Sequence, residues 1–319
     1  MPTKMITTGT TFTSTGTTST SAFQIPGYYY APGSTVGYYI EGTDLSDYLW
    51  GSAKDDTMHG YSGNDVLYGQ GGNDTIFGEN GNDQLFGGVG NDKLDGGAED
   101  DWLDGGSGAD ILIGGTGYDT VSYFNSGGVT VQLGYRGFGG DAEGDTYSGI
   151  ENVLGSGGWD TIIGDAGDNR LDGGAGDDEI VGGAGRDILI GGLGKDRLTG
   201  DSSGVYGEDI FVIEKLNYPD NWQYDTITDF GGGDKIKLVG FSVTDLGSDG
   251  KLASGILYDD GLVRYAEDLD ASDKLITDQF GGLFYGDFEM RDDGEWYVTN
   301  LVTVVDVGPR LSTGDLLFA

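Results

Sequence analysis

The chain has 319 residues, of which 54 are acidic and 16 basic, so its net charge is −38. Such self-repulsion destabilises a compact state unless cations neutralise it, and it argues against nucleic acid as a partner, because phosphates would be repelled. Cysteine is absent, which excludes disulfide bonds. No apolar run has the length of a signal-peptide core or a transmembrane helix, so we expect neither.

Residues 1–41 form the first predicted segment. Between Thr7 and Ser21 it consists almost entirely of Thr, Ser and Gly, the composition of a flexible leader. Tyrosine-rich runs then begin at Tyr28 and Tyr38. We expect them to form a strand or cap over the open end of the repeats that follow, because a terminal repeat has one face without a neighbour.

Residues 42–122 repeat with a period of nine. Glycine stands at the first position of every repeat from Gly42 to Gly114, aspartate at the sixth and an apolar residue at the eighth. The aspartates are Asp47, Asp56, Asp65, Asp74, Asp83, Asp92, Asp101, Asp110 and Asp119. The apolar residues are Leu49, Met58, Leu67, Ile76, Leu85, Leu94, Leu103, Leu112 and Val121. A fixed short period of this kind predicts a stacked coil with a cation between its turns.

Each repeat is expected to form half a coil. Glycines at positions one, two and four permit a tight loop with positive φ, and the apolar eighth residue lies in a short strand and faces inward. Alternate repeats therefore stack on one side, about 4.8 Å apart, where their carboxylates would repel one another. A divalent cation between the loops turns this repulsion into coordination, and hard oxygen ligands select Ca²⁺.

Residues 123–154 interrupt the period with two strand-like runs, 129–133 and 150–154. Asp141, Glu143 and Asp145 in this segment fit either an extra calcium site or a solvated loop, and we favour the loop. A second array spans residues 155–208 and carries Asp160, Asn169, Asp178, Asp187 and Asp196 at its sixth positions. The next turn, residues 200–205, lacks the aspartate, so the array is expected to end there.

Residues 209–319 contain strand-like runs separated by Gly and Asp turns, which predict a β-rich C-terminal cap. The runs are residues 210–213, 226–230, 235–238, 255–258 and 296–299. The last residues, 314–319, place an acid before an apolar end.

The repeats resemble those of the RTX (repeats-in-toxin) family, whose motif is G-G-x-G-x-D-x-U-x with U a large apolar residue; residues 87–95 and 114–122 are complete copies. The resemblance covers about residues 42–245 and implies an all-β, right-handed parallel β-roll, or β-solenoid, in two stacked arrays. It implies that each Ca²⁺ binds backbone carbonyls and the aspartates of two successive loops on one side, with about ten ions in all.

The aspartates implied as calcium ligands are Asp56, Asp65, Asp74, Asp83, Asp92, Asp101, Asp110, Asp119, Asp160, Asp178, Asp187 and Asp196. The glycines implied as carbonyl ligands are Gly63, Gly72, Gly78, Gly81, Gly87, Gly90, Gly96, Gly105, Gly108, Gly114, Gly173, Gly176, Gly182, Gly185 and Gly191. Leu45, Lys54 and Glu99 replace the fourth glycine, and Asn169 replaces an aspartate, so we expect weak or empty sites there.

The resemblance implies a bacterial, extracellular protein that leaves the cell through a type I secretion apparatus, with residues 314–319 as its uncleaved signal. We expect a non-catalytic surface, adhesion or host-interaction protein whose candidate partners, besides calcium, are glycans, a cell surface or a host membrane. His59 is the only histidine, and no G-x-S-x-G sequence is present. The alternative is a polysaccharide-modifying or hydrolytic enzyme, or a detached module of one, with its site in the C-terminal region.

Trp50, Tyr68 and Phe86 occupy outward ninth positions and predict an aromatic ladder on one face. The ladder fits a sugar or partner platform, or burial under residues 28–39, and we favour burial.

Overall fold

The computed structural model describes residues 37–201, 207–214, 225–229 and 234–239, together with the backbone of short strands elsewhere. Within these residues every regular element is a β-strand except one 3-10 helix, η1 (Gly140–Ala142). The predicted leader, the run at 255–258 and residues 314–319 lie outside the described residues. The chain divides into two compact units, Met1–Asp165 and Ala166–Ala319.

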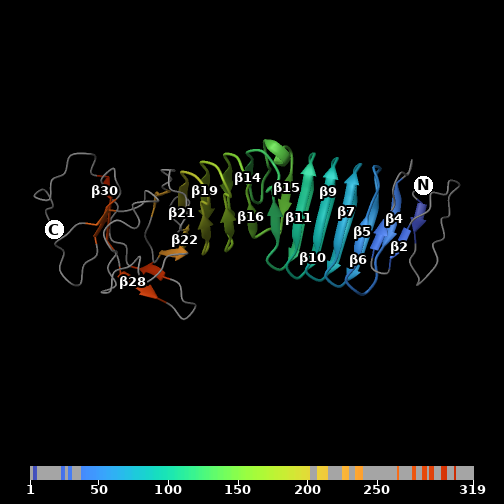
Figure 1. Cartoon of the computed structure of the whole chain (residues 1–319), viewed down its shortest axis with the longest axis horizontal. Coiled ribbons are helices and arrows are strands. Elements are labelled where there is room, and N and C mark those ends of the chain that lie inside the picture. The colour runs from blue at the N-terminus through green and yellow to red at the C-terminus, as the bar shows by residue number, and fades with distance from the viewer. Residues whose placement is uncertain are drawn as a thin grey trace, which may run out of the picture. The chain divides into compact units, whose positions relative to one another are not determined.

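In the first unit, successive strands of the repeats alternate between two sheets (Figure 1). One sheet contains β1 (Thr3–Met5), β4 (Tyr38–Glu41), β6 (Thr57–Ser62), β8 (Thr75–Asn80), β10 (Lys93–Ala98), β12 (Ile111–Thr116) and β15 (Thr146–Ser148). The other contains β2 (Phe23–Ile25), β3 (Tyr28–Tyr30), β5 (Tyr48–Trp50), β7 (Val66–Gly71), β9 (Gln84–Val89), β11 (Trp102–Ser107), β13 (Thr120–Ser122) and β16 (Asn152–Leu154).

Neighbouring strands of the repeats are parallel and in register two repeats apart. Leu94 lies opposite Leu112 in one sheet, and Leu85 lies opposite Leu103 in the other. Each nine-residue repeat is therefore half a coil, as predicted, and the fold is an all-β parallel β-solenoid. At the N-terminal end β3 pairs with β5 and β4 with β6, so the tyrosine-rich runs extend the two sheets.

The core of this unit is the column of eighth-position side chains. Side chains alternate along each strand, and the second inward position is the first glycine of the next repeat, so one side chain per repeat points inward. Every one of these side chains, from Leu49 to Val121, has an exposed fraction of 0%. Full burial of such a side chain stabilises the fold by roughly 1.5–3 kcal/mol. The single column is why one apolar position per repeat is sufficient.

The interruption of the period remains inside the stack of coils. β15 pairs with β12 and β16 pairs with β13, both parallel. The segment between these strands also carries β14 (Thr130–Gln132), which pairs with β17 (Thr161–Ile163). Residues 123–145 are therefore a long insertion within one coil, and the chain after them rejoins both sheets through β15 and β16.

In the second unit the same parallel pairing continues past residue 209. One run of neighbours is β18 (Arg170–Asp172), β20 (Ile188–Ile190), β22 (Ile210–Glu214) and β24 (Lys235–Val239). The other is β19 (Glu179–Gly183), β21 (Arg197–Asp201) and β23 (Thr226–Ile227). Antiparallel strands follow: β25 (Arg264–Tyr265), β26 (Leu275–Thr277), β27 (Gly282–Tyr285), β28 (Asp287–Met290), β29 (Trp296–Thr299) and β30 (Val305–Asp306).

Candidate metal centres

The sixth-position aspartates form two rows in the first unit, one on each side of the coil. One row consists of Asp47, Asp65, Asp83, Asp101 and Asp119, and the other of Asp56, Asp74, Asp92 and Asp110. The exposed fraction of every member is at most 3%. The alternation of sides predicted from the period is confirmed.

In every member of the two rows after Asp47, one carboxylate oxygen is held by the preceding coil. The backbone N–H of Asp65 donates to Oδ1 of Asp83 at 2.7 Å, and that of Asp83 donates to Oδ1 of Asp101 at 2.8 Å. The same bond recurs in the second unit, where Asp187 donates to Oδ1 of Asp209 at 2.9 Å. These bonds fix the orientation of each carboxylate.

The other oxygen of most of these carboxylates has no partner. Oδ2 is buried and makes no hydrogen bond in Asp65, Asp74, Asp83, Asp92, Asp101, Asp110, Asp119, Asp187, Asp196 and Asp209. A buried charged oxygen without a partner costs several kcal/mol, and native proteins rarely leave one unsatisfied. A regular row of such atoms therefore calls for a cation.

The first glycine of each repeat leaves the space that such a cation needs. A Cβ atom at Gly78 would lie 2.3 Å from Oδ2 of Asp83 and 2.6 Å from the carbonyl oxygen of Gly96 in the next coil. The same pair of contacts recurs at Gly60, Gly69 and Gly87. Oxygens from two successive coils thus converge where a side chain is missing. Among the described residues no three acidic or histidine side chains come together, so backbone carbonyls must supply ligands.

The fourth-position glycines supply the tight turn. Gly81 has φ +125°, and a Cβ there would lie 2.0 Å from the carbonyl oxygen of Gly63 one coil earlier. Positive φ is shared by Gly63, Gly72, Gly90, Gly108, Gly176 and Gly185. Glu99, which replaces this glycine, also has a positive φ of 73°, and its Oε2 accepts a hydrogen bond from the N–H of Gly81 at 2.9 Å. The loop shape is therefore kept at this expected weak turn.

Without a cation, the rows hold protons tightly. Burial raises the pKa of Asp101 and of Asp110 to about 8 and that of Asp65 to about 7. The N–H bond from the preceding coil opposes the shift of each pKa, and repulsion from carboxylates in adjacent coils adds to it. Protons and metal ions therefore compete for these oxygens.

Three turns differ, and we call them the start turns: residues 42–47, 51–56 and 155–160. Each has Ser or Thr at the second position. Oδ2 of Asp47 accepts hydrogen bonds from the N–H and hydroxyl of Thr43 at 2.6 and 2.8 Å. In Asp160, Oδ2 accepts from the N–H of Ser156 at 2.6 Å and Oδ1 from its hydroxyl at 2.8 Å.

Asp56 follows the same pattern, because the N–H of Ser52 donates to its Oδ2 at 2.5 Å and the N–H of Tyr38 donates to its Oδ1. Two of the predicted ligands, Asp56 and Asp160, thus have both carboxylate oxygens hydrogen-bonded within the protein. They lack the unpartnered oxygen that marks the other turns.

Ser156→Ala tests the start turns. We expect a loss of about 1–2 kcal/mol in unfolding free energy, because a bond to a buried carboxylate disappears, and no change in the number of bound calcium ions. Urea denaturation in saturating calcium and equilibrium dialysis measure the two quantities. Ser148→Ala, at an exposed position of β15, is the control and should change neither. A calcium ion lost from the Ser156 variant would show that this turn also holds metal.

In the interruption, Asp145 follows Asp110 in its row, and a tyrosine hydroxyl donates to its second carboxylate oxygen. Asp145 is fully buried, and its Oδ1 accepts from the N–H of Asp110 at 2.8 Å, as an aspartate of the row would. Its Oδ2 accepts from the hydroxyl of Tyr123 at 2.6 Å, and that hydroxyl lies 2.7 Å from the hydroxyl of Tyr147. The solvated-loop interpretation is therefore wrong for Asp145, although Glu143 is exposed.

Beyond Gly200, where the second array is expected to end, the row of aspartates has one further member. Asp209 takes the sixth position, with an exposed fraction of 0%. Both aspartates carried a signal in the sequence that the period did not reveal, because an inward apolar or aromatic residue follows two positions later, Phe211 after Asp209 and Tyr147 after Asp145.

The predicted aromatic ladder is present and its rings stack on one another. The ring centroids of Trp50 and Tyr68 are 5.5 Å apart, and those of Tyr68 and Phe86 are 4.7 Å apart, with interplanar angles of 12° and 9°. Both faces of Tyr68 are therefore covered by neighbouring rings. β3 pairs with β5 in the same sheet, so it lies beside β5 and not over the ladder.

His59, the only histidine, belongs to the opposite sheet. Its ring stacks on Phe77 with a centroid distance of 4.8 Å, and its Nδ1 lies 2.8 Å from Oε1 of Glu79. These contacts give the side chain a packing role on the outer face of β6.

Rows of buried carboxylates between the coils of a parallel β-solenoid define a calcium-binding β-roll. The family described as the RTX calcium-binding nonapeptide repeat matches residues 41–76, 59–94, 86–121, 154–189 and 172–203. Residues 41–121 and 154–203 therefore carry repeats of this family, and RTX repeats bind Ca²⁺. No curated protein matches the chain. Among the described residues, no helix has the length and apolar character needed to cross a bilayer.

Proposed function

We propose that the protein is secreted through a type I system, folds when it meets extracellular Ca²⁺, and acts as a non-catalytic surface, adhesion or host-interaction protein. The observation that carries the calcium-dependent folding is the row of buried Oδ2 atoms without partners. When bound, the ions supply positive charge that links the carboxylates of consecutive coils. Proteins with RTX repeats are typically secreted, which supports the extracellular part of this proposal.

The proposed ligands are the aspartates with an unpartnered Oδ2 and the carbonyl oxygens of the first-position glycines in the following coil. For Asp83 these are its own carboxylate and the carbonyl of Gly96. Extracellular modules of this type have dissociation constants of about 10⁻⁴–10⁻³ M, far above cytosolic free calcium. Each site held at about ten times its dissociation constant adds roughly 1.4 kcal/mol, so about ten sites could exceed the whole stability of a typical domain.

Calcium removal is the direct test. We expect far-UV circular dichroism of the full chain at neutral pH to show the β-roll in millimolar Ca²⁺ and an unfolded spectrum in EGTA. Mg²⁺ at the same concentration should not restore the fold, because it prefers a smaller and more rigid octahedral site. A β-spectrum that survives EGTA unchanged would remove the basis of the proposal.

The enzymatic alternative places a site in the C-terminal region. Beyond residue 239 the structure describes only the backbone of short strands, and no observation on the described residues favours this alternative. Hydrolase assays on polysaccharides and a glycan-array screen with the calcium-loaded chain separate the two functions. Turnover of a polysaccharide would favour the enzyme, and binding without turnover the adhesive role.

A further inference from the structure

The fifth position of the repeat, next to the buried aspartate, makes a second hydrogen bond between coils. The N–H of Asn73 donates to Oδ1 of Asp55 in the preceding coil, and the N–H of Asn91 donates to Oδ1 of Asn73, both at 2.8 Å. The fifth-position side chains that accept such a bond are exposed. They are Ser46, Asp55, Asn64, Asn73, Asn91, Asp100, Asp168 and Asp177.

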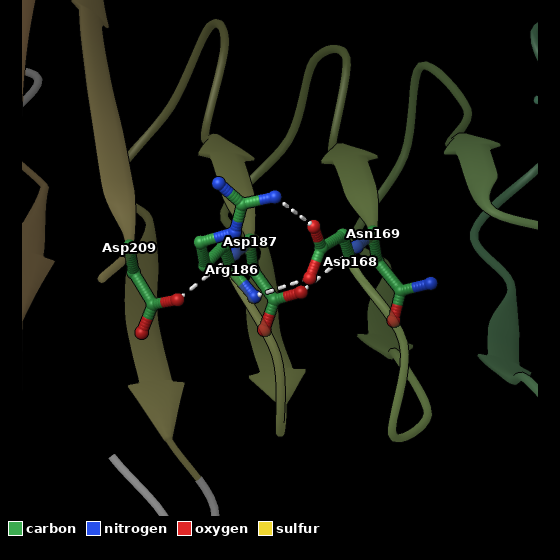
Figure 2. Close-up of polar contacts among 5 residues, drawn as sticks. All are labelled: Asp168, Asn169, Arg186, Asp187 and Asp209. Carbon is green, nitrogen blue, oxygen red and sulfur yellow. Dashed lines mark hydrogen bonds and ion pairs between the residues drawn. The ribbon is translucent and has the colours of Figure 1, made fainter. Parts of the chain in front are cut away.

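This bond runs in the opposite direction to the bond of the aspartate beside it. Figure 2 shows both bonds in the second unit, where Oδ1 of Asp168 accepts from the N–H of Arg186 in the following coil at 2.9 Å. Beside it, Oδ1 of Asp187 accepts from the N–H of Asn169 in the preceding coil, also at 2.9 Å. Neighbouring loops are therefore joined by two reciprocal bonds, and neither bond includes a metal ion.

The paired loops are the ones that present oxygens to an ion. A Cβ at Gly69 would lie 2.3 Å from Oδ2 of Asp74 and 2.7 Å from the carbonyl oxygen of Gly87 in the next coil. These two oxygens belong to the same pair of loops that the bond between Asn73 and Asn91 joins. Their separation depends on the spacing of the loops. A site whose oxygens are already in place loses less conformational freedom when an ion binds.

We propose that the fifth-position residues are positioning residues for calcium, which hold successive loops at the spacing that an ion requires and so raise its affinity without contacting it. Asn, Asp and Ser all occupy this position, and they share a short side chain with an oxygen that accepts hydrogen bonds. The inference rests on the proposed calcium-dependent folding.

One fifth-position residue lacks the bond and offers a control within the first unit. Among the described residues, no N–H of the following coil donates to the side chain of Asn82, which is exposed as Asn73 is. The following turn has Glu99 in place of its fourth glycine, and Oε2 of Glu99 accepts from the N–H of Gly81 instead. The same substitution at Asn73 and Asn82 therefore removes a bond between coils only at Asn73.

Asn73→Ala and Asn82→Ala are the test, in a calcium titration of the full chain against a chelating dye. Asn73→Ala should bind as many ions as the wild type, but one of them about two- to tenfold more weakly, the effect of one hydrogen bond. Asn82→Ala should bind calcium as the wild type does. Equal affinities in all three proteins, or equal weakening in both variants, overturn the inference. An ion lost from Asn73→Ala even in saturating calcium would make Asn73 a ligand and also overturn it. A wild type without bound calcium overturns the proposed function itself.

Asn73→Asp distinguishes positioning from the loss of the amide itself. The carboxylate keeps the acceptor, as at Asp55 and Asp100, so the affinity of the wild type should return. Asn82→Asp adds the same charge where no bond forms and measures the effect of charge alone. The positioning role is overturned if Asn73→Asp, corrected for this effect, binds calcium as weakly as Asn73→Ala.

Asn91→Ala is a second variant on the same side of the coil. Oδ1 of Asn91 accepts from the N–H of Ala109 at 2.9 Å, so its removal should weaken calcium binding by a similar factor. Circular dichroism in excess calcium shows which variants fold, and this one provides the comparison with Asn82→Ala if Asn73→Ala does not. Binding equal to that of Asn82→Ala would again overturn the inference.

Discussion

Calcium-free protein is expected to keep more of its β-structure at pH 5 than at pH 8. Burial raises the pKa of Asp74, Asp101 and Asp110 to about 8 and that of Asp187 to about 7, against an ordinary value of 3.8 in the unfolded chain. The folded state therefore binds more protons than the unfolded state between pH values of about 4 and 8.

The sign follows from this difference. A carboxyl group with a raised folded pKa costs nothing while it is protonated in both states, and it destabilises the fold increasingly as pH rises towards the folded pKa. One pKa unit corresponds to about 1.4 kcal/mol, so several such groups together outweigh the 5–15 kcal/mol of a typical domain. Calcium reverses the trend, because it binds the ionised form and displaces the protons.

Protein freed of metal on a chelating resin, with no soluble chelator, permits the comparison at both pH values. Urea denaturation followed by circular dichroism gives the unfolding free energy of each sample. Calcium-saturated protein is the control and should be at least as stable at pH 8 as at pH 5. Metal-free protein that is more stable at pH 8 would contradict the assignment of the buried rows as the source of the calcium requirement.

Gly90→Ala is expected to cost about 4 kcal/mol or more in unfolding free energy, even in saturating calcium. Gly90 has φ +143°, and a Cβ there would lie 1.6 Å from the carbonyl oxygen of Gly72 in the preceding coil. The oxygen belongs to the backbone and the Cβ is fixed to its own Cα, so no flexible side chain can move aside, and the coils must separate where a calcium ion would join them.

Gly127→Ala is the matched control. A Cβ at Gly127 meets no atom within 4 Å, and its φ lies outside the left-handed range. We expect a change of less than about 0.5 kcal/mol. Thermal melts of both variants at several calcium concentrations measure the effect, and the same midpoint in both would show that the stack tolerates a side chain at the fourth position.

Much of the fold could be predicted because the inward apolar residue, the aspartate and the first glycine each recur at one fixed position of the repeat. Leu85 and Leu94 are inward because side chains alternate along a strand and the other inward position of each strand is a glycine. Asp83 and Asp101 share a side because two half-coils return the chain to it. The same regularity placed the first glycines beside the carboxylates. The period, together with the resemblance to the RTX repeats, therefore located the candidate ligands of the regular coils.

The part of the site that the sequence did not predict depends on loops whose lengths differ from the nine-residue period. Asp145 and Asp209 rejoin the rows through loops of other lengths, and only the structure shows where such a loop returns. The start turns differ from the other turns by one hydroxyl group. The hydroxyl of Ser156 or Thr43 donates a hydrogen bond to the carboxylate of its own turn. Ser or Thr at the second position is visible in the sequence, but only the hydrogen bonds of the structure show what these residues do.

The start turns bear on the order in which the coils assemble. In the first coil of the first unit, Oδ2 of Asp47 and Oδ2 of Asp56 already accept hydrogen bonds from Thr43 and Ser52, so this coil can form before any ion arrives. Each later aspartate finds the N–H of the preceding coil already in place. We expect folding to begin at this first coil and to proceed one repeat at a time as calcium binds. The nearest-neighbour contacts of repeat proteins allow such stepwise folding.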